Sequence, residues 1–138
     1  MENDIERQHM VVVEVEGRVV GLMVMNEEQS PEYADVSWKY SGRVLVIHRL
    51  TIDPANQRRG LAMRLVEFAE EVAAAKKYGC IRLDAFTKYT AASTLYEKHG
   101  YKRAGKVRFR KGEFFCYEKE LGAERSGKTT NKSISPAT

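Results

Sequence analysis

The chain has 138 residues, of which 43% are apolar and 30% are charged, and its formal net charge at pH 7 is +4. These values are typical of one globular domain and leave no room for two large ones. The longest apolar runs are far shorter than the roughly 20 residues that cross a bilayer, and residues 1–10 lack the apolar core of a secretion signal. We therefore expect a cytoplasmic protein with no membrane segment. The mild positive charge does not argue for a nucleic-acid partner, and it suits a site that binds phosphate groups.

The two cysteines, Cys80 and Cys116, each lie in an apolar stretch that is typical of a strand. We interpret both as buried, reduced thiols. No Cys-x-x-Cys or Cys/His spacing indicates a metal site, and nothing in the sequence requires a disulfide.

The first part of the chain predicts three strands. Residues 9–16 and 18–25 are rich in β-branched side chains and meet at Glu16-Gly17, which predicts a hairpin with a tight turn there. Residues 26–42 are mostly polar or turn-forming and are expected to form a loop. Residues 43–52 are apolar on both faces, which favours a central strand.

An amphipathic helix follows the third strand. Apolar residues recur at helical spacing from Leu61 to Ala73, and Gly79 is expected to end this helix. Residues 80–86 then predict a fourth strand. A strand–helix–strand unit of this kind has a right-handed crossover, so residues 43–52 and 80–86 are expected to form parallel strands.

A second helix and two more strands complete the pattern. Thr90 is expected to cap a short helix that runs to His99, and Gly100 is expected to end it. Residues 101–109 and 113–121 predict two strands joined near Lys111-Gly112.

The composition changes at Gly122, after which Ile134 is the only large apolar residue. We therefore expect a domain over residues 1–121 and a flexible tail over residues 122–138. The order β-β-β-α-β-α-β-β predicts an α/β fold, with a mixed sheet and helices on its faces.

The turn before the first helix has the composition of an anion site. It reads Gln57-Arg58-Arg59-Gly60-Leu61-Ala62 and leads into the first helical turn, where backbone N–H groups and the helix dipole attract anions. Gly60 allows a ligand to approach closely, and Arg58 and Arg59 add positive charge. A Walker P-loop is excluded because no Gly-Lys-Ser/Thr follows, and the Gly-x-Gly-x-x-Gly of dinucleotide-binding folds is absent. The alternative is a basic, solvated loop.

A second motif, Leu95-Tyr96-Glu97-Lys98, lies in the second predicted helix. Together with Leu50-Thr51-Ile52-Asp53-Pro54 and the turn from Gln57 to Ala62, it resembles the GNAT superfamily of N-acetyltransferases, over about residues 9–121. The resemblance implies a GNAT-like acyl-CoA N-acyltransferase fold with acetyl-CoA as the acetyl donor.

The resemblance also implies roles for particular residues. The exposed backbone around Leu50, Thr51 and Ile52 would bind the pantetheine arm as an added strand. The turn from Gln57 to Ala62, extended to Met63, would hold the pyrophosphate. Tyr96 would lie beside the thioester sulfur.

The chemistry of acetyl transfer suits a tyrosine at position 96. A phenol with an ordinary pKa near 10 stays protonated at pH 7, so Tyr96 is a candidate proton donor to the departing thiolate. The alternative is a packed aromatic ring whose hydroxyl is satisfied nearby. The incoming amine must lose a proton, and His48 titrates in the right range to accept it, unless it is an ordinary core histidine. Glu14 and Glu16 are weaker candidates, and a water relay stays open.

The sequence departs from the family pattern in two places. GNAT proteins commonly have an asparagine seven residues before the tyrosine, where this chain has Tyr89, a candidate for packing against the pantetheine. The family also usually opens with a strand and two helices before the first hairpin, and these help to form the acceptor site. This chain starts almost at the hairpin, so a minimal member, a truncated one or a homodimer that completes the pocket are all open. Trp38 and Tyr40 are candidates for lining an acceptor pocket, with packing at the sheet edge as the alternative.

The leading hypothesis is an N-acetyltransferase that moves an acetyl group from acetyl-CoA to a primary amine of a small molecule or protein by direct attack. The alternative is a non-catalytic acyl-CoA-binding sensor or interaction module, which the two departures favour slightly. A transferase that acts on charged tRNA is a third hypothesis, suggested by the basic turn. The sequence does not identify the acceptor amine.

Overall fold

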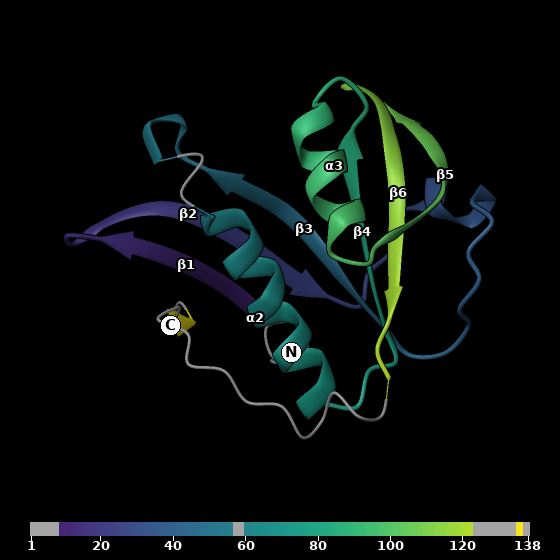
Figure 1. The fold of residues 1–138 in the computed structure, drawn as a ribbon. Coiled ribbons are helices and arrows are strands. Elements are labelled where there is room, and N and C mark those ends of the chain that lie inside the picture. Colours follow the sequence, from purple (N-terminus) through teal and green to yellow (C-terminus); the bar gives the residue numbers. More distant parts are fainter. Residues whose placement is uncertain (1–8, 57–59, 123–134, 137–138) are drawn as a thin grey trace.

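The computed structural model describes residues 9–56, 60–122 and 135–136. One sheet contains seven strands in the order β5-β6-β4-β3-β2-β1-β7 (Figure 1). The elements in chain order are β1 (His9–Val15), β2 (Arg18–Asn26), the 3-10 helix η1 (Pro31–Asp35), β3 (Val44–Ile52), the 3-10 helix η2 (Pro54–Asn56), α2 (Leu61–Ala75), β4 (Cys80–Phe86), α3 (Thr90–Lys98), β5 (Lys102–Phe109), β6 (Gly112–Glu120) and β7 (Ser135–Pro136). The predicted order from β1 to β6 is confirmed. Among the described residues, no helix has both the length and the apolar character needed to cross a membrane.

The centre of the sheet is β3, as its apolar sequence predicts. It pairs in parallel with β4 on one side and antiparallel with β2 on the other, so the predicted parallel pairing of β3 and β4 is confirmed. The β1–β2 hairpin turns at Glu16 and Gly17, which both have positive φ, at 53° and 80°. This pair of left-handed residues matches the twist of the two strands, which is why a glycine stands at the second position.

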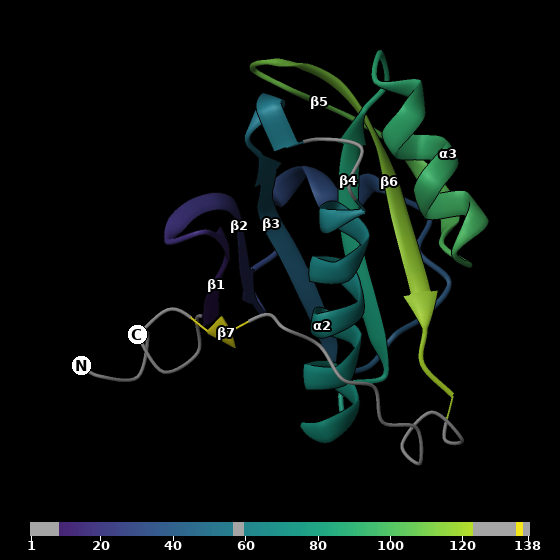
Figure 2. The same cartoon turned by 60° about the vertical axis from the view of Figure 1, so that its left-hand side comes forward.

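Both helices pack on the same face of the sheet, whereas the sequence predicted helices on its faces (Figures 1 and 2). Residues of α2 and α3 join one apolar cluster with strand residues such as Leu45 and Tyr117. The opposite face carries a second cluster, in which Tyr33 of η1 packs with Val46 and Cys116. The loop of residues 27–43 therefore covers this face of the sheet, in the place where a helix could otherwise pack.

A buried ion pair fastens that loop to the sheet. Arg82 of β4 and Glu118 of β6 each expose 8% of their side chains, and their closest N–O distance is 4.0 Å. The Glu118 carboxylate accepts hydrogen bonds from the backbone N–H groups of Lys39 at 2.7 Å and Tyr40 at 3.3 Å. Arg82 donates to the Tyr40 carbonyl at 2.6 Å and stacks 4.2 Å from the ring centroid of Trp38. A buried charge without its partner is costly, so this pair holds the loop in one conformation.

Two predicted helix ends differ in the structure. The helix α2 ends at Ala75, four residues before Gly79, and Lys77 takes the left-handed conformation with φ 67° just beyond it. Gly79 serves a packing role instead, because a Cβ atom there would clash with the Tyr40 hydroxyl. At the start of α3, the cap position is Tyr89 rather than Thr90, and no side chain caps the helix there.

Candidate active site

Strands β3 and β4 separate partway along their length. Residues 44–46 of β3 pair with residues 80–82 of β4, after which β3 continues beside β2 and β4 continues beside β6. A β-bulge helps to turn β3 away, since Leu22 pairs with Thr51 while Val24 pairs with His48, which leaves one extra residue in β3. Within the bulge, Arg49 has φ 55°. Bulges bend a strand and re-aim its side chains, and this one opens the sheet at its centre.

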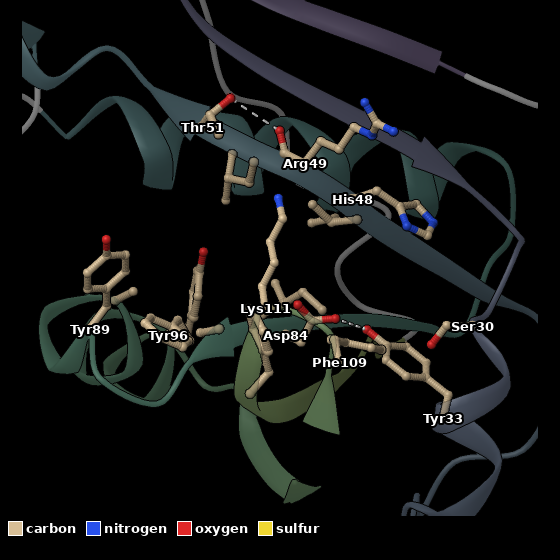
Figure 3. Close-up of a pocket in the computed structure, with 17 residues that line it drawn as sticks. Ser30, Tyr33, His48, Arg49, Thr51, Asp84, Tyr89, Tyr96, Phe109 and Lys111 are labelled. Atoms are coloured by element: carbon tan, nitrogen blue, oxygen red, sulfur yellow. Dashed lines mark hydrogen bonds between the residues drawn. The ribbon is translucent and has the colours of Figure 1, made fainter. Parts of the chain in front are cut away.

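A pocket of about 930 Å³ fills the opening. It lies at the upper end of the usual volume range for small-molecule sites, about 300–1,000 Å³. Five residues that the sequence assigned to the site line it together: His48, Leu50, Thr51, Tyr89 and Tyr96 (Figure 3). Separate segments of the chain therefore bring the predicted catalytic pair and part of the predicted cofactor site into one cavity.

Tyr96 projects from α3 into the pocket from the helix-covered face. Its side chain is buried, and its ring lies 5.9 Å from that of Tyr117 and 6.1 Å from that of Tyr101. Burial raises the pKa of Tyr96 to about 12, and the negative charge on Asp84 adds to the effect. This raised pKa keeps the phenol protonated at neutral pH. No hydrogen bond joins the Tyr96 hydroxyl to another described residue, so the hydroxyl is free to donate to a ligand.

His48 enters the pocket from β3. Its Nε2 lies 2.7 Å from Asn26 Oδ1, and this same oxygen accepts the N–H of Glu28 at 2.9 Å. Because an amide oxygen only accepts, Nε2 carries the hydrogen and Nδ1 is the basic nitrogen. Burial lowers the pKa of His48 below its ordinary value, while the charge on Asp84 opposes the shift. The ring is therefore neutral at pH 7 and able to accept a proton.

Asp84 of β4 is a site residue that the sequence analysis missed. Its carboxylate lines the pocket, and Oδ2 accepts a hydrogen bond of 2.7 Å from the buried hydroxyl of Tyr33 (Figure 3). Burial raises the pKa of Asp84, while the Tyr33 hydrogen bond and then His48 oppose the rise. One signal was available in the sequence, because a carboxylate inside the mostly apolar strand Cys80–Phe86, where Arg82 is the other charged residue, needs a reason to be there.

The predicted phosphate turn is partly described. Gln57, Arg58 and Arg59 lie outside the described residues. Gly60 is exposed with φ 74°, and a Cβ atom there would meet only open space. The first described helical hydrogen bond runs from the N–H of Arg64 to the Gly60 carbonyl at 3.1 Å, so the N–H groups before it point out of the helix end.

Four further predicted cofactor residues do not line the pocket. Leu61 and Met63 bury their side chains in the core, so only their backbone could meet a ligand. Ala62 is half-buried on the same first turn of α2, and Ile52 is half-buried at the end of β3. Their predicted roles rest on backbone groups and stay predictions.

Several residues proposed from the sequence as possible site residues lie elsewhere. Trp38 packs 5.0 Å from the Tyr33 ring, and Tyr40 packs against the sheet, so the alternative of edge packing describes both better than a role in lining the pocket. Glu14 and Glu16 belong to the β1–β2 hairpin and do not line the pocket either.

The two cysteines are buried and free, as the sequence analysis proposed. Burial raises the pKa of Cys80 and of Cys116 to about 12, so both stay protonated thiols. Among the described residues, no group of three or more His, Cys, Asp or Glu is placed to hold a metal ion.

The geometry fits a long ligand that replaces a strand pairing. Residues 47–52 of β3 do not pair with β4, so the backbone on this side of β3 can hydrogen-bond an extended, amide-containing molecule. Such a molecule could run from the first turn of α2 at Gly60 to the pocket. Its end would meet a protonated phenol on one side of the sheet and a carboxylate with a neutral imidazole on the other. This arrangement suits transfer of a group between two bound molecules with exchange of protons.

Comparison with known proteins identifies the family. Residues 6–103 match the model of the acetyltransferase (GNAT) domain. Among solved structures, an acetyltransferase of the GNAT family from Streptococcus pneumoniae is 20% identical, with a TM-score of 0.66 over 85% of this chain and 68% of that chain. The ribosomal-protein-S18-alanine N-acetyltransferase from Escherichia coli is 17% identical, with a TM-score of 0.65 over 84% of this chain and 70% of that chain.

A third structure, a GNAT family acetyltransferase from Elizabethkingia anophelis with acetyl-CoA bound, is 12% identical, with a TM-score of 0.62 over 87% of this chain and 80% of that chain. At such low identities these structures establish the fold. A search of curated proteins gives no significant match. The family match covers most of the chain, and the chain therefore belongs to the GNAT family of acetyltransferases.

Proposed function

We propose that this protein transfers the acetyl group of acetyl-CoA to a primary amine of a small molecule or protein, by direct attack of the amine. The observation that carries the proposal is the opening between β3 and β4, which brings Tyr96, His48 and Asp84 into one pocket. Acetyl-CoA supplies the reactive thioester, whose acetyl carbon accepts a nucleophile and whose sulfur leaves as a thiolate.

The residues of the opening fit acetyl-CoA. The unpaired edge of β3 near Leu50 and Thr51 would hydrogen-bond the amide groups of the pantetheine arm. The open space at Gly60 and the outward-pointing N–H groups of the first turn of α2 would receive the pyrophosphate. Tyr89 exposes 67% of its side chain at the pocket and would pack against the arm.

Tyr96 would act as the proton donor. Its hydroxyl has no hydrogen-bond partner among the described residues, and its pKa, raised to about 12, keeps the proton available at neutral pH. A buried phenol beside the sulfur would stabilise the developing thiolate and protonate it.

Asp84 would bind the incoming ammonium group and accept its proton. A carboxylate whose pKa is raised by burial is a better base than an exposed one. His48 is the second candidate, since its lowered pKa leaves Nδ1 unprotonated. The site therefore has its proton donor on the helix side of the sheet and its proton acceptors on the other side.

Acetyl-CoA turnover across a panel of primary amines, followed by thiol release, tests this proposal. Tyr96→Phe should lower kcat by about tenfold or more while the Kd of acetyl-CoA changes little, and Asp84→Asn should lower kcat/KM by about a hundredfold. Tyr78→Phe and Asp35→Asn, whose side chains lie outside the pocket, are matched controls.

The outcomes distinguish the two main hypotheses from the sequence. Full activity of Tyr96→Phe would show that Tyr96 is not the proton donor. Saturable binding of acetyl-CoA with no turnover of any amine would instead support a non-catalytic acyl-CoA-binding module.

A further inference from the structure

The pocket contains an acidic and a basic side chain that do not pair with each other. Asp84 lies on the β4 wall, and Lys111 extends from the β5–β6 turn across the pocket toward β3 (Figure 3). No ion pair or hydrogen bond joins the Lys111 ammonium to another described residue. A cation that faces a cavity without a partner is available to bind an anion.

Asp84 is also incompletely paired. Tyr33 donates to Oδ2, and no described residue donates to Oδ1. Ser30 lines the same side of the pocket, and its buried Oγ has no hydrogen-bond partner among the described residues. These polar atoms leave room for a bound group that donates hydrogen bonds, such as an ammonium.

The walls between the two charges are apolar. Phe109 and Phe114 line the pocket beside Lys111, with ring centroids 5.3 Å apart. Aromatic walls displace water and so strengthen an interaction between opposite charges at the pocket. Arg49 also lines the pocket, but its guanidinium points away from the cavity, so Lys111 supplies the positive charge that faces Asp84 (Figure 3).

We propose that the acceptor is an amine that also carries an acidic group, a carboxylate or a phosphate, with its ammonium at Asp84 and its acidic group at Lys111. This inference rests on the proposed acetyl transfer and names the class of acceptor. Lys111 is then a specificity-determining residue that favours acidic amines over neutral ones.

Matched acceptors test the inference. Phenylalanine is compared with phenylalaninamide, and O-phosphoethanolamine with ethanolamine, as kcat/KM ratios of the acid to its neutral partner. Comparing each ratio between wild type and variants cancels the intrinsic reactivity of the amines. Lys111→Met should lower at least one ratio by about fivefold or more, as expected for loss of a partly exposed ion pair. Lys111→Arg should retain most of the preference.

A matched control and a binding readout complete the experiment. Lys88→Met removes a neighbouring cation that does not line the pocket, so it should leave the ratios unchanged. Equal ratios in wild type and Lys111→Met would overturn the inference. It would also be overturned if Lys111→Met weakened acetyl-CoA binding without changing the ratios, because Lys111 would then serve the donor.

Calorimetric titration of the same four acceptors into the CoA-bound protein separates the two proposals. If no amine is acetylated, the proposed function fails, whereas tighter binding of the acids that depends on Lys111 would still support the inference. If neither acid binds better than its neutral partner and neither is acetylated faster, the inference is wrong.

Discussion

The hydrogen bond from Tyr33 to Asp84 predicts a change in the pH dependence of catalysis. The bond is 2.7 Å long, and the Tyr33 side chain is 3% exposed. Since the phenol donates to the carboxylate, it stabilises the charged form and opposes the rise in the Asp84 pKa that burial causes. Tyr33→Phe removes the donor and keeps the ring, so the pKa of Asp84 should rise further.

The size of the effect follows from the strength of such a bond. A hydrogen bond to a charged group contributes about 1.5–3 kcal/mol. Each 1.36 kcal/mol corresponds to a tenfold change in a protonation equilibrium, so the acidic limb of kcat/KM should move up by about one pH unit or more. Activity should fall strongly below the midpoint of this limb and remain close to wild type on the plateau above it.

The assay is the pH profile of kcat/KM with one amine, measured for wild type and variant. Titration of the acceptor affects both proteins equally and cancels. Tyr78→Phe is the matched control, because Tyr78 donates to the exposed Glu27 away from the pocket. An acidic limb that stays in place would refute Asp84 as the base and favour His48, and an equal loss at every pH would indicate a purely structural role for Tyr33.

Three further changes test other parts of the structure. Asp84→Asn should raise the Tm at pH 7, because burial raises the pKa of Asp84, so that its charged form opposes folding. The gain in Tm should vanish at a pH where wild-type Asp84 is protonated, and a lower Tm of the variant at pH 7 would contradict this prediction. Gly60→Glu should weaken acetyl-CoA binding much more than Gly60→Ala, which shares the strain of φ 74° but adds no charge. Equal Kd values for the two variants would show that the phosphates do not bind at Gly60. Gly79→Ala should lower stability by about 1–3 kcal/mol in urea unfolding, because the new methyl group meets the Tyr40 ring, and an unchanged midpoint would show that the ring moves freely.

The parts of the site that sequence could predict are those with a local signal. The Leu-Tyr-Glu-Lys segment of α3 is a short motif in a helix that the sequence defines locally, and it brings Tyr96 to the pocket. The role of the turn before α2 rests on a similar local motif and stays a prediction. The β1–β2 hairpin was equally clear, because Glu16-Gly17 has the composition of its turn. In each case, residues adjacent in sequence carry the whole signal.

The missed residues depend on contacts between distant segments. Asp84 acquires its environment from Tyr33, which lies 51 positions away, and from the opening between β3 and β4. Lys111 looked like an ordinary turn residue, since only the position of the β5–β6 hairpin brings it to the pocket. Trp38 suggested a pocket wall, but the buried Arg82 holds it on the sheet. Local composition does not tell whether such a residue lines the pocket or packs elsewhere, because tertiary packing decides its position.

The structural features on the two faces of the sheet are linked through β4. On one face, Arg82 and Glu118 fix the loop of residues 27–43 and so set Tyr33 against Asp84. On the other face, the alternate residues Leu83 and Ala85 belong to the core under the helices. Because successive side chains of a strand point to opposite faces, one short strand can join the side that carries the proposed proton acceptors to the side that carries Tyr96. The loss of β3 pairing beyond residue 46 then lets a ligand contact both sides at once, which a continuous sheet would prevent.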